Sequence, residues 1–419
     1  MGRAQTTFGL RRPLMGLVLA AVAAALVTAG CGDDGGGGSA DGTITLGAVV
    51  PSSGPFAEWG QGNTVALKML QREINADGGI DGKDVRFRIS DDAADPAQAA
   101  NLIRKLSDEG ALAIAGPLTS SSAEVAFPVA NQMEVASVSQ ASSKPGVAEE
   151  NRPWAFRNTI DEGILADATV TQWQEMFDIQ KAAIIYDSKD AVSTAIGTAI
   201  YPEVLDGHGI EVLTGDDPPS FQTGDVDVSA QVTQIKSMSP DGVVIGADYS
   251  QAITVIREME KQGLTVPVTG GTPLISTAIL RSSEEIPIVA PATYYVGIEE
   301  ERAREFTDKL TEELRAAGHA DLEPTMYDAN IYEIGQMFVE ALRQEGASGS
   351  VEEDRTTIRD YMDRLEGFEG LVGPISFSES GDAEKSFYVV LAEEGEWVPT
   401  VVCESSAPEE CEKAQGSGS

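Results

Sequence analysis

From Thr43 onward, short apolar runs alternate with longer amphipathic segments along the chain. The short runs, such as 182–186 and 242–245, are apolar at nearly every position, which is typical of parallel strands covered on both faces. The longer segments place apolar residues three or four positions apart, which indicates helices. Strands and helices that alternate in this way predict βαβ units and doubly wound α/β sheets.

A break near Asn158 divides this pattern into two halves with a similar number of strand–helix units, so we predict two similar α/β lobes. Before the break, we expect strands at 43–50, 84–90, 111–115 and 135–138, and helices at 62–75, 96–108 and 120–132. After it, we expect strands at 182–186, 210–213, 242–245 and 266–269, and helices at 165–177, 191–205, 226–236 and 251–262.

The order of elements changes after Ala290. A strand at 293–297 is followed by three helices at 299–317, 327–343 and 356–365, and then by strands at 386–392 and 397–402. Three late helices are too few for a third domain, so we expect the chain to return to the first lobe and then to the second. The expected first lobe is 43–159 with 298–372, the second lobe is 160–297 with 373–402, and the tail at 403–419 is polar and disordered.

The N-terminus has the pattern of an export signal. Arginines precede an uncharged Leu-, Val- and Ala-rich run, so 1–30 is interpreted as a signal peptide. Cys31 follows small residues and resembles the lipidated cysteine of a bacterial lipobox, although Thr28 stands where leucine is usual. Residues 31–42 are rich in Gly, Ser and Asp and are interpreted as a flexible linker. An uncleaved membrane anchor is the alternative, and either interpretation places the remainder outside the cytoplasm.

Charge and cysteine content narrow the function classes. The 419 residues include 67 Asp and Glu against 29 Lys and Arg, a formal net charge of -38, which argues against nucleic-acid binding. If Cys31 is lipidated, Cys403 and Cys411 remain as an even pair that could form a disulfide, with unpaired thiols as the alternative. No Cys/His cluster has zinc spacing, and we expect neither a metal nor a cofactor.

The sequence lacks the motifs of the common enzyme classes. It contains no nucleophile elbow, P-loop, dinucleotide fingerprint or zinc-protease motif. The two histidines, His208 and His319, lie beside glycines at turns and are interpreted as solvated loop residues. We therefore expect a binding protein rather than an enzyme, with an extracellular hydrolase that uses Asp or Glu as a remote alternative.

Six segments, in order, resemble the leucine/isoleucine/valine-binding protein family, the type I periplasmic binding proteins of branched-chain amino-acid importers. They are 46–55 followed by Trp59-Gly60, 73–82, 91–96, 116–122, 327–329 and 373–377. The resemblance covers 43 to about 402 and implies two doubly wound parallel-sheet lobes joined by three hinge crossovers, which we place near Thr159, Gly297 and Gly373.

The resemblance also implies a ligand site in the first lobe. Ser120 and Ser143 align with the family's carboxylate anchors, and Trp59 aligns with an aromatic residue that walls the ligand side chain. The pattern agrees, because a serine-rich helix start at the carboxyl end of a strand offers hydroxyls and free backbone N–H groups to an anion. Ser121 and Ser142, which lie beside these anchors, are counted as candidate ligand residues too. The alternatives are that Ser120 or, more readily, Ser121 caps its helix and that Trp59 is a core residue.

One departure leaves the ligand open. The family holds the ligand ammonium partly with an acid, and Thr272 stands at that position. Asp248, Tyr249, Asp161 or Glu162 could replace the acid, with Asp248 and Tyr249 taken as the second lobe's contribution. The ligand could therefore be a branched-chain amino acid, another amino acid, an amide, or a carboxylate without an amine.

The resemblance implies a partner and a place of action. A monomeric, lipid-anchored protein on the outer face of the cytoplasmic membrane would close around its ligand and deliver it to the permease subunits of an ABC importer. A sensor that presents the ligand to a receptor is the alternative.

Overall fold

The computed structural model describes residues 42–283 and 285–414. The predicted signal peptide, Cys31 and most of the predicted linker lie outside them. The first sheet has five parallel strands in the order β2-β1-β3-β4-β5. Its strands are β1 (Ile44–Val50), β2 (Val85–Asp91), β3 (Ala113–Ala115), β4 (Ala136–Ser139) and β5 (Ala155–Arg157).

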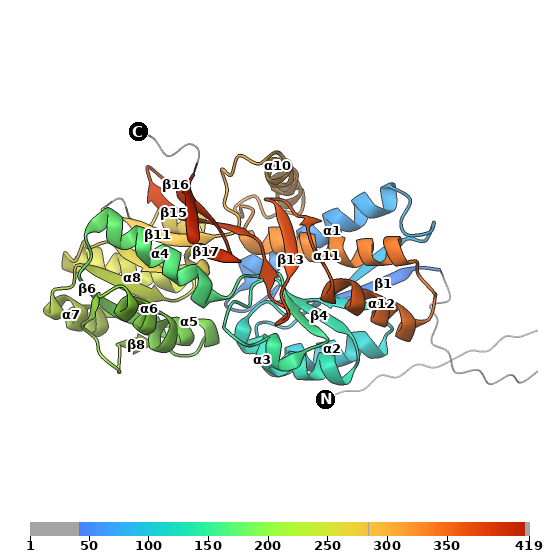
Figure 1. Cartoon of the computed structure of the whole chain (residues 1–419), viewed down its shortest axis with the longest axis horizontal. Coiled ribbons are helices and arrows are strands. Elements are labelled where there is room, and N and C mark those ends of the chain that lie inside the picture. The colour runs from blue at the N-terminus through green and yellow to red at the C-terminus, as the bar shows by residue number, and fades with distance from the viewer. Residues whose placement is uncertain (1–41, 284, 415–419) are drawn as a thin grey trace, which may run out of the picture. The chain divides into compact units, whose positions relative to one another are not determined.

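Helices from two distant parts of the chain pack around the first sheet. In Figure 1 the blue and cyan helices α1 to α3 lie beside the orange α11 and α12. Residue contacts join α1 to α10 and α11, and α12 to β4, so the late helices belong with the first sheet. These helices are α1 (Ala57–Ala76), α2 (Pro96–Asp108), α3 (Ser120–Gln132), α10 (Glu301–Ala316), α11 (Met326–Glu345) and α12 (Val351–Asp363), with a 3-10 turn at Glu149–Asn151.

The second sheet has a parallel centre and an antiparallel edge. Its order is β17-β16-β15-β11-β10-β9-β6-β7, with β8 also paired to β6. Strands β6 to β11 pair in parallel, whereas β15, β16 and β17 are added antiparallel to their neighbours. The strands are β6 (Lys181–Asp187), β7 (Glu211–Val212), β8 (Ser220–Phe221), β9 (Gly242–Gly246), β10 (Val268–Gly270), β11 (Ile288–Ala292), β15 (Ser386–Glu393), β16 (Glu396–Glu404) and β17 (Ala407–Lys413).

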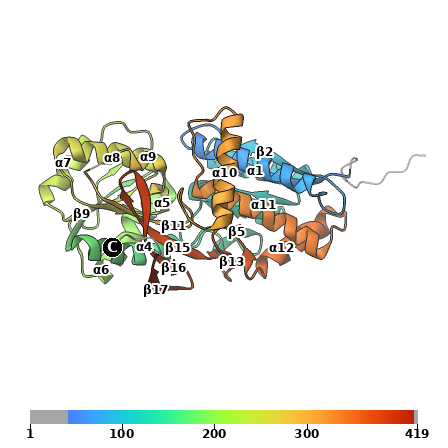
Figure 2. The ribbon, with the colours of Figure 1, turned by 90° about the horizontal axis from the view of Figure 1, so that it is seen from above.

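The helices of the second sheet follow its strands in the βαβ order that the sequence predicts. Figure 2 shows them in green and yellow around the strands. They are α4 (Glu162–Phe177), α5 (Ala191–Ala195), a π-helical turn (Ile196–Ile200), α6 (Tyr201–Gly207), α7 (Ser229–Met238), α8 (Tyr249–Gln262), a 3-10 turn (Thr272–Leu274) and α9 (Thr277–Leu280). No helix among residues 42–283 and 285–414 is long and apolar enough to cross a membrane.

Three passages connect the two sheets with their helices. The chain runs from β5 to α4 past Thr159, and from β11 to α10 past Gly297. The third passage contains a small antiparallel sheet of β12 (Phe368–Glu369), β13 (Pro374–Phe377) and β14 (Ala383–Glu384), and Gly373 lies just before β13. The architecture is thus two doubly wound sheets joined by three crossovers. The exact residue boundaries expected for the two lobes stay a prediction.

Two segments that the sequence analysis assigned have a different structure from the one expected. The strand expected at 293–297 lies instead at β11, Ile288–Ala292, and 293–297 belongs to the second crossover. The tail expected to be disordered from Cys403 completes β16 and then forms β17 over Ala407–Lys413. Both misassignments have a local cause: Pro291 interrupts the first strand's pattern, and the second strand is mostly charged.

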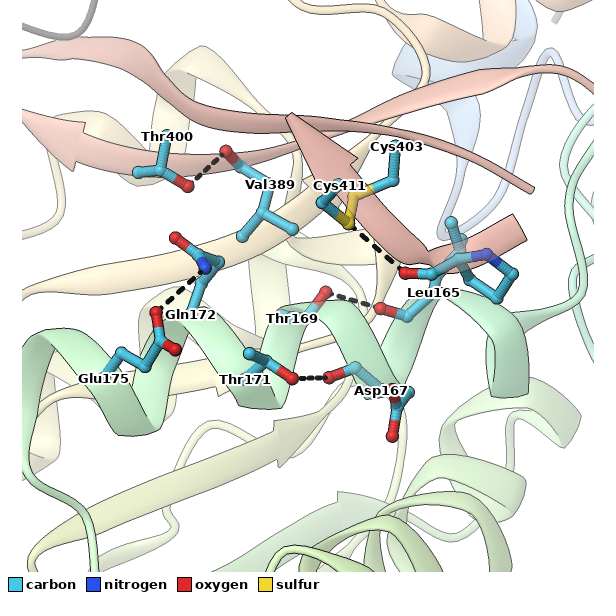
Figure 3. Close-up of a disulfide and its surroundings, with 11 residues drawn as sticks. Leu165, Asp167, Thr169, Thr171, Gln172, Glu175, Val389, Thr400, Cys403 and Cys411 are labelled. Carbon is cyan, nitrogen blue, oxygen red and sulfur yellow. Dashed lines mark hydrogen bonds between the residues drawn. A yellow bond between two sulfur atoms is a disulfide. The ribbon is translucent and has the colours of Figure 1, made fainter. Parts of the chain in front are cut away.

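The disulfide between Cys403 and Cys411 explains why a polar tail is ordered. It joins β16 to β17 across eight residues of sequence, and Figure 3 shows it facing helix α4. Cys403 is almost fully buried in the same apolar cluster as Leu165 and Trp173 of α4. The cross-link and this packing hold a strand whose side chains bury little apolar surface by themselves.

Candidate functional site

Five side chains of the site lie just beyond the carboxyl ends of strands. Ser120 follows β3, Ser142 and Ser143 follow β4, Glu162 follows β5 as the first residue of α4, and Thr272 follows β10. In open α/β sheets this edge is where ligands bind. We call these five residues the anchor cluster. Their exposed fractions are at most 5%, so they form a buried polar group.

Glu162 is the centre of the anchor cluster. Ser143 Oγ donates to Glu162 Oε2 at 2.7 Å, and Thr272 donates to both carboxylate oxygens, from N at 3.0 Å and from Oγ1 at 3.0 Å. The backbone N–H of Glu162 also donates to the carbonyl of Ser143 at 2.9 Å. The glutamate therefore bridges a loop of the first sheet and a loop of the second.

Burial sets the ionisation of Glu162. Loss of solvent raises the pKa of its carboxyl above the ordinary 4.5, while the hydrogen bonds from Ser143 and Thr272 oppose that rise. Within the described part of the chain, no Lys or Arg is paired with this carboxylate by an ion pair. A buried carboxylate without a cation favours a cationic group when one can reach it.

The serines at the start of α3 divide their roles. Thr119, not Ser120, caps the helix, because its Oγ1 accepts from the N–H of Ser122 at 3.1 Å. Ser120 Oγ accepts instead from Ser142 Oγ at 3.0 Å and from Lys144 N at 3.4 Å. Ser121, expected to be a cap, accepts from the N–H of Ala191 at 3.1 Å, beside the second sheet. Ser120 is thus free of capping and belongs to the anchor cluster.

Aromatic rings border the anchor cluster. Trp59 is 5% exposed and stands with its ring centroid 4.7 Å from Tyr327, 5.5 Å from Tyr249 and 5.3 Å from Phe56. Burial is the main cause that raises the pKa of the Tyr327 hydroxyl, and the nearby charge of Glu162 is the next. The aromatic wall expected from Trp59 is therefore larger than the sequence indicated.

A cavity of about 90 Å³ is lined by Trp59 and Tyr249 but by none of the five anchor residues. Its lining residues include Glu58, Trp59, Tyr249, Tyr294, Tyr295 and Trp397. Tyr249 donates its hydroxyl hydrogen to Glu58 Oε2, so a residue of α8 contacts a residue of α1 across the cavity. A larger groove of about 740 Å³ lies among α1, α11 and α12, away from the anchor cluster, and none of the expected ligand residues lines it.

Asp248, expected to contact the ligand, caps a helix. Its Oδ1 accepts from the N–H groups of Ser250 and Gln251 and so caps α8. Asp190 caps α5 in the same way by accepting from Ser193. Burial is the main cause that raises the pKa of both carboxyls. The acid nearest the predicted serines is therefore Glu162, one of four replacements that the sequence left open.

The arrangement suits binding rather than catalysis. Hydroxyls and a helix N-terminus can hold an anion, a buried carboxylate can hold a cation, and the rings can cover an apolar side chain. No group of three or more His, Cys, Asp and Glu residues within 42–283 and 285–414 is placed to hold a metal ion. The sequence had placed Tyr327 in a family-like segment at the start of a predicted helix and had named Glu162 as one of four candidate acids, but it assigned neither residue to the site.

Comparisons with known proteins identify the family and the fold. The periplasmic binding protein family model matches residues 43–396. A Leu/Ile/Val-binding protein of Rhizobium johnstonii is 24% identical over 359 residues, which is 85% of this chain and 93% of the relative. An amino acid binding protein of Pseudomonas aeruginosa is 24% identical over 351 residues, which is 83% of this chain and 89% of that one.

Solved structures share the fold. The isoleucine complex of the branched-chain amino acid transporter substrate binding protein from Streptococcus pneumoniae has a TM-score of 0.76 at 21% identity, covering 86% of this chain and 99% of that one. A Rhodopseudomonas palustris solute binding protein in complex with 3,4-dihydroxybenzoic acid has a TM-score of 0.75 at 20% identity, covering 87% and 98%. This chain therefore belongs to the periplasmic binding protein family, in the group of the leucine/isoleucine/valine-binding proteins.

Proposed function

We propose that this protein binds a small amino acid, or a close analogue that carries an ammonium, between its two sheets and delivers it to an ABC importer. The observation that carries the proposal is the buried Glu162 carboxylate, held by Ser143 from one side and Thr272 from the other. Glu162 would supply the carboxylate that the family has at the position of Thr272. Thr272 thereby changes role, because it orients the acid instead of being the acid.

The site would distinguish the carboxylate end of the ligand from its ammonium end by charge. The carboxylate of an amino acid would accept from Ser120 and Ser143 and from the free N–H groups at the start of α3, whose first turn contains no acidic residue. The ammonium would donate to Glu162. In that arrangement the Ser143–Glu162 hydrogen bond is exchanged for two bonds to the ligand, and the side chain faces Trp59 and Tyr327.

The three crossovers connect delivery of the ligand to the conformation of the protein. Three connections between the two sheets permit a hinge motion that encloses the ligand, and the enclosed form is what permease subunits would recognise. Export, a lipid on Cys31 and a monomeric state complete the proposal and rest on the N-terminal sequence and on the family. A receptor-coupled sensor with the same fold would share the binding step and differ only in its partner.

A ligand without an amine is the second candidate. The neighbour that binds 3,4-dihydroxybenzoic acid shows that this fold accepts an aromatic acid, and the rings of Trp59, Tyr249 and Tyr327 form an aromatic wall here. Against this candidate stands Glu162, because bringing a ligand carboxylate near a buried carboxylate without a cation raises the free energy of binding.

A thermal-shift panel on the purified protein tests the proposal. It would contain the twenty amino acids, short amides, polyamines, and benzoates and other carboxylates that lack an amine. Ligand that binds only the folded state raises the midpoint, by about 2.7 kcal/mol of stability at one hundred times the dissociation constant. We expect shifts with one or a few amino acids. Midpoint shifts with benzoates alone would contradict an amino-acid ligand and favour the second candidate, a carboxylate without an amine.

A further inference from the structure

Arg157, at the end of β5, contacts the loop that carries Ser143. Its side chain is completely buried, and Nη1 donates to the carbonyl oxygens of Ser142, at 3.4 Å, and of Lys144. These two carbonyls flank Ser143 on both sides. The guanidinium therefore fixes the backbone from which the Ser143 hydroxyl reaches Glu162.

The same guanidinium contacts the start of α4. Nη2 donates to Asp161 Oδ2 at 2.9 Å, and Asp161 Oδ1 accepts from the N–H of Gly163 at 2.9 Å, which caps the helix. Glu162 is the first residue of that helix and lies between the two residues of the cap. Arg157 thus holds, through Asp161, the backbone on which Glu162 stands.

A third contact joins Arg157 to the last crossover. Nε donates to Asp382 Oδ1, and the backbone N–H of Arg157 donates to the carbonyl of Gly381 at 2.9 Å. Asp382 touches neither the Ser142–Lys144 loop nor α4 in any hydrogen bond of the described residues, since its other partners are Ser378 and Ser380. This contact anchors Arg157 without involving the anchor cluster.

We propose that Arg157 is the positioning residue of the ligand site: one buried guanidinium sets the distance between Ser143 and Glu162. This inference rests on the proposed function of these two residues as ligand anchors. The planar group has five N–H donors in a fixed fork, so it can hold the carbonyls of the loop and the carboxylate of the cap at the same time. A lysine keeps the positive charge but has a single nitrogen, which cannot reach both sides.

A purely structural role predicts something different. Arg157 forms two ion pairs with carboxylates, and such buried networks support folding in many proteins that bind nothing nearby. In that case, any substitution that breaks the network lowers stability, and ligand affinity follows stability in proportion. In our proposal, affinity depends on which arm of the network is broken.

Three variants separate these roles: Arg157→Lys, Asp161→Asn and Asp382→Asn. For each we would measure the dissociation constant of the amino acid found in the panel and the free energy of unfolding in urea. We expect the first two variants to weaken binding at least tenfold, and Asp382→Asn to weaken it less than threefold while losing comparable stability. Equal losses of affinity in Asp161→Asn and Asp382→Asn, or full affinity in Arg157→Lys, would overturn the proposal.

Amide hydrogen exchange tests the same inference without any ligand. In Arg157→Lys we expect Ser142–Lys144 and the first turn of α4 to exchange faster together, and in Asp382→Asn we expect faster exchange only at 378–383. Failure of the wild type to bind amino acids would contradict the proposed function, and the exchange pattern would still test the positioning role of Arg157. Unchanged exchange in both segments of Arg157→Lys would refute that role directly.

Discussion

The helix that starts nearest the site in the first sheet begins with serines, whereas three helices packed on the second sheet, α4, α5 and α8, begin with carboxylates. Helix α3 has Ser120 and Ser121 in its first turn and no acid, while α4 starts at Glu162, and Asp190 and Asp248 cap α5 and α8. A helix N-terminus carries partial positive charge. In the second sheet, the protein's own carboxylates already neutralise that charge.

In the proposed complex, this difference would orient the ligand. The only one of these N-termini without its own anion is that of α3, so a ligand carboxylate gains most there. A ligand ammonium gains most beside the carboxylates, and Glu162 is the one bonded to the serine loop. A zwitterion therefore fits in one direction only. Removing one charge from the ligand, or its partner from the protein, should show which protein group binds that charge.

The largest effect is expected from Glu162→Gln, which keeps the shape and removes the charge. Truncating one partner of a buried charge pair costs about 2–5 kcal/mol, so affinity for the amino acid should fall by about 30-fold or more. Isothermal titration calorimetry would measure it. Asp248→Asn is the matched control, because that acid caps α8 and contacts no anchor residue by a hydrogen bond; an equal loss there would mean that overall negative charge, not Glu162, binds the ammonium.

A smaller effect is expected from Ser143→Ala. It removes one hydroxyl that serves the ligand carboxylate, a net loss of about 1–2 kcal/mol or roughly tenfold in affinity. Ser121→Ala is the control in the same hydroxyl-bearing wall, since Ser121 accepts from Ala191 and lies outside the anchor cluster. Both variants would be titrated with the same amino acid. A larger loss of affinity in Ser121→Ala than in Ser143→Ala would contradict the division of roles between the two serines.

Affinity should also depend on pH. Because burial raises the folded pKa of Glu162 above 4.5, the carboxyl is protonated at pH values where a free glutamate is ionised. Binding of an ammonium needs the ionised form, so affinity should fall as pH decreases through the raised pKa, and binding at pH values near or below that pKa should release a proton. Folding stability without ligand depends on pH in the opposite direction to affinity. The stability that this carboxyl contributes is fully present below its unfolded pKa of 4.5 and is lost as pH rises through the raised folded pKa.

Calorimetry in two buffers of different ionisation enthalpy would detect that proton. Glu162→Gln should bind weakly at every pH with no proton released. Proton release that persists in Glu162→Gln would assign the titration to another group, such as Asp190 or Asp248, whose pKa burial also raises.

The smallest effect on binding is expected from the double variant Cys403→Ser with Cys411→Ser. Opening an eight-residue loop should lower stability by about 2.5 kcal/mol in the chain-entropy account, while the affinity stays within a factor of two. The reason is position, since the disulfide faces α4 from β16 and β17. The hydrogen bond from its Cys411 sulfur goes to the carbonyl of Pro408, which is not an anchor residue. Urea unfolding and titration together measure both quantities, and a large loss of affinity would show that the tail hairpin shapes the site.

The local parts of the fold were predictable because their signals are local. The helix expected at 120–132 has those bounds in α3, and the run at 242–245 lies within β9. Strand β17 was missed because its residues are mostly charged and its order depends on a disulfide and on packing against α4. Strand β11 was misplaced because Pro291 breaks an apolar run whose pairing partners lie elsewhere in the chain.

The sequence analysis named four of the five anchor residues, Ser120, Ser142, Ser143 and Thr272, as candidate ligand residues and left Glu162 among the alternatives for the acid. Ser120 and Ser143 follow strands, so their place at the sheet edge comes from the pattern, and the resemblance adds their role. Glu162 could not be chosen over Asp161 or Asp248, because its partners Ser143 and Thr272 are 19 and 110 residues away and meet it only in the folded chain. The role of Arg157 depends in the same way on contacts across the crossovers.

The most direct test of the account compares an amino acid with its analogue that lacks the amine but keeps the carboxylate and side chain. Both would be titrated into the wild-type protein and into Glu162→Gln. We predict that loss of the ammonium weakens binding to the wild type at least 30-fold and changes binding to Glu162→Gln less than threefold. Equal or tighter binding of the amine-free analogue by the wild type would contradict the claim that Glu162 faces a cationic group.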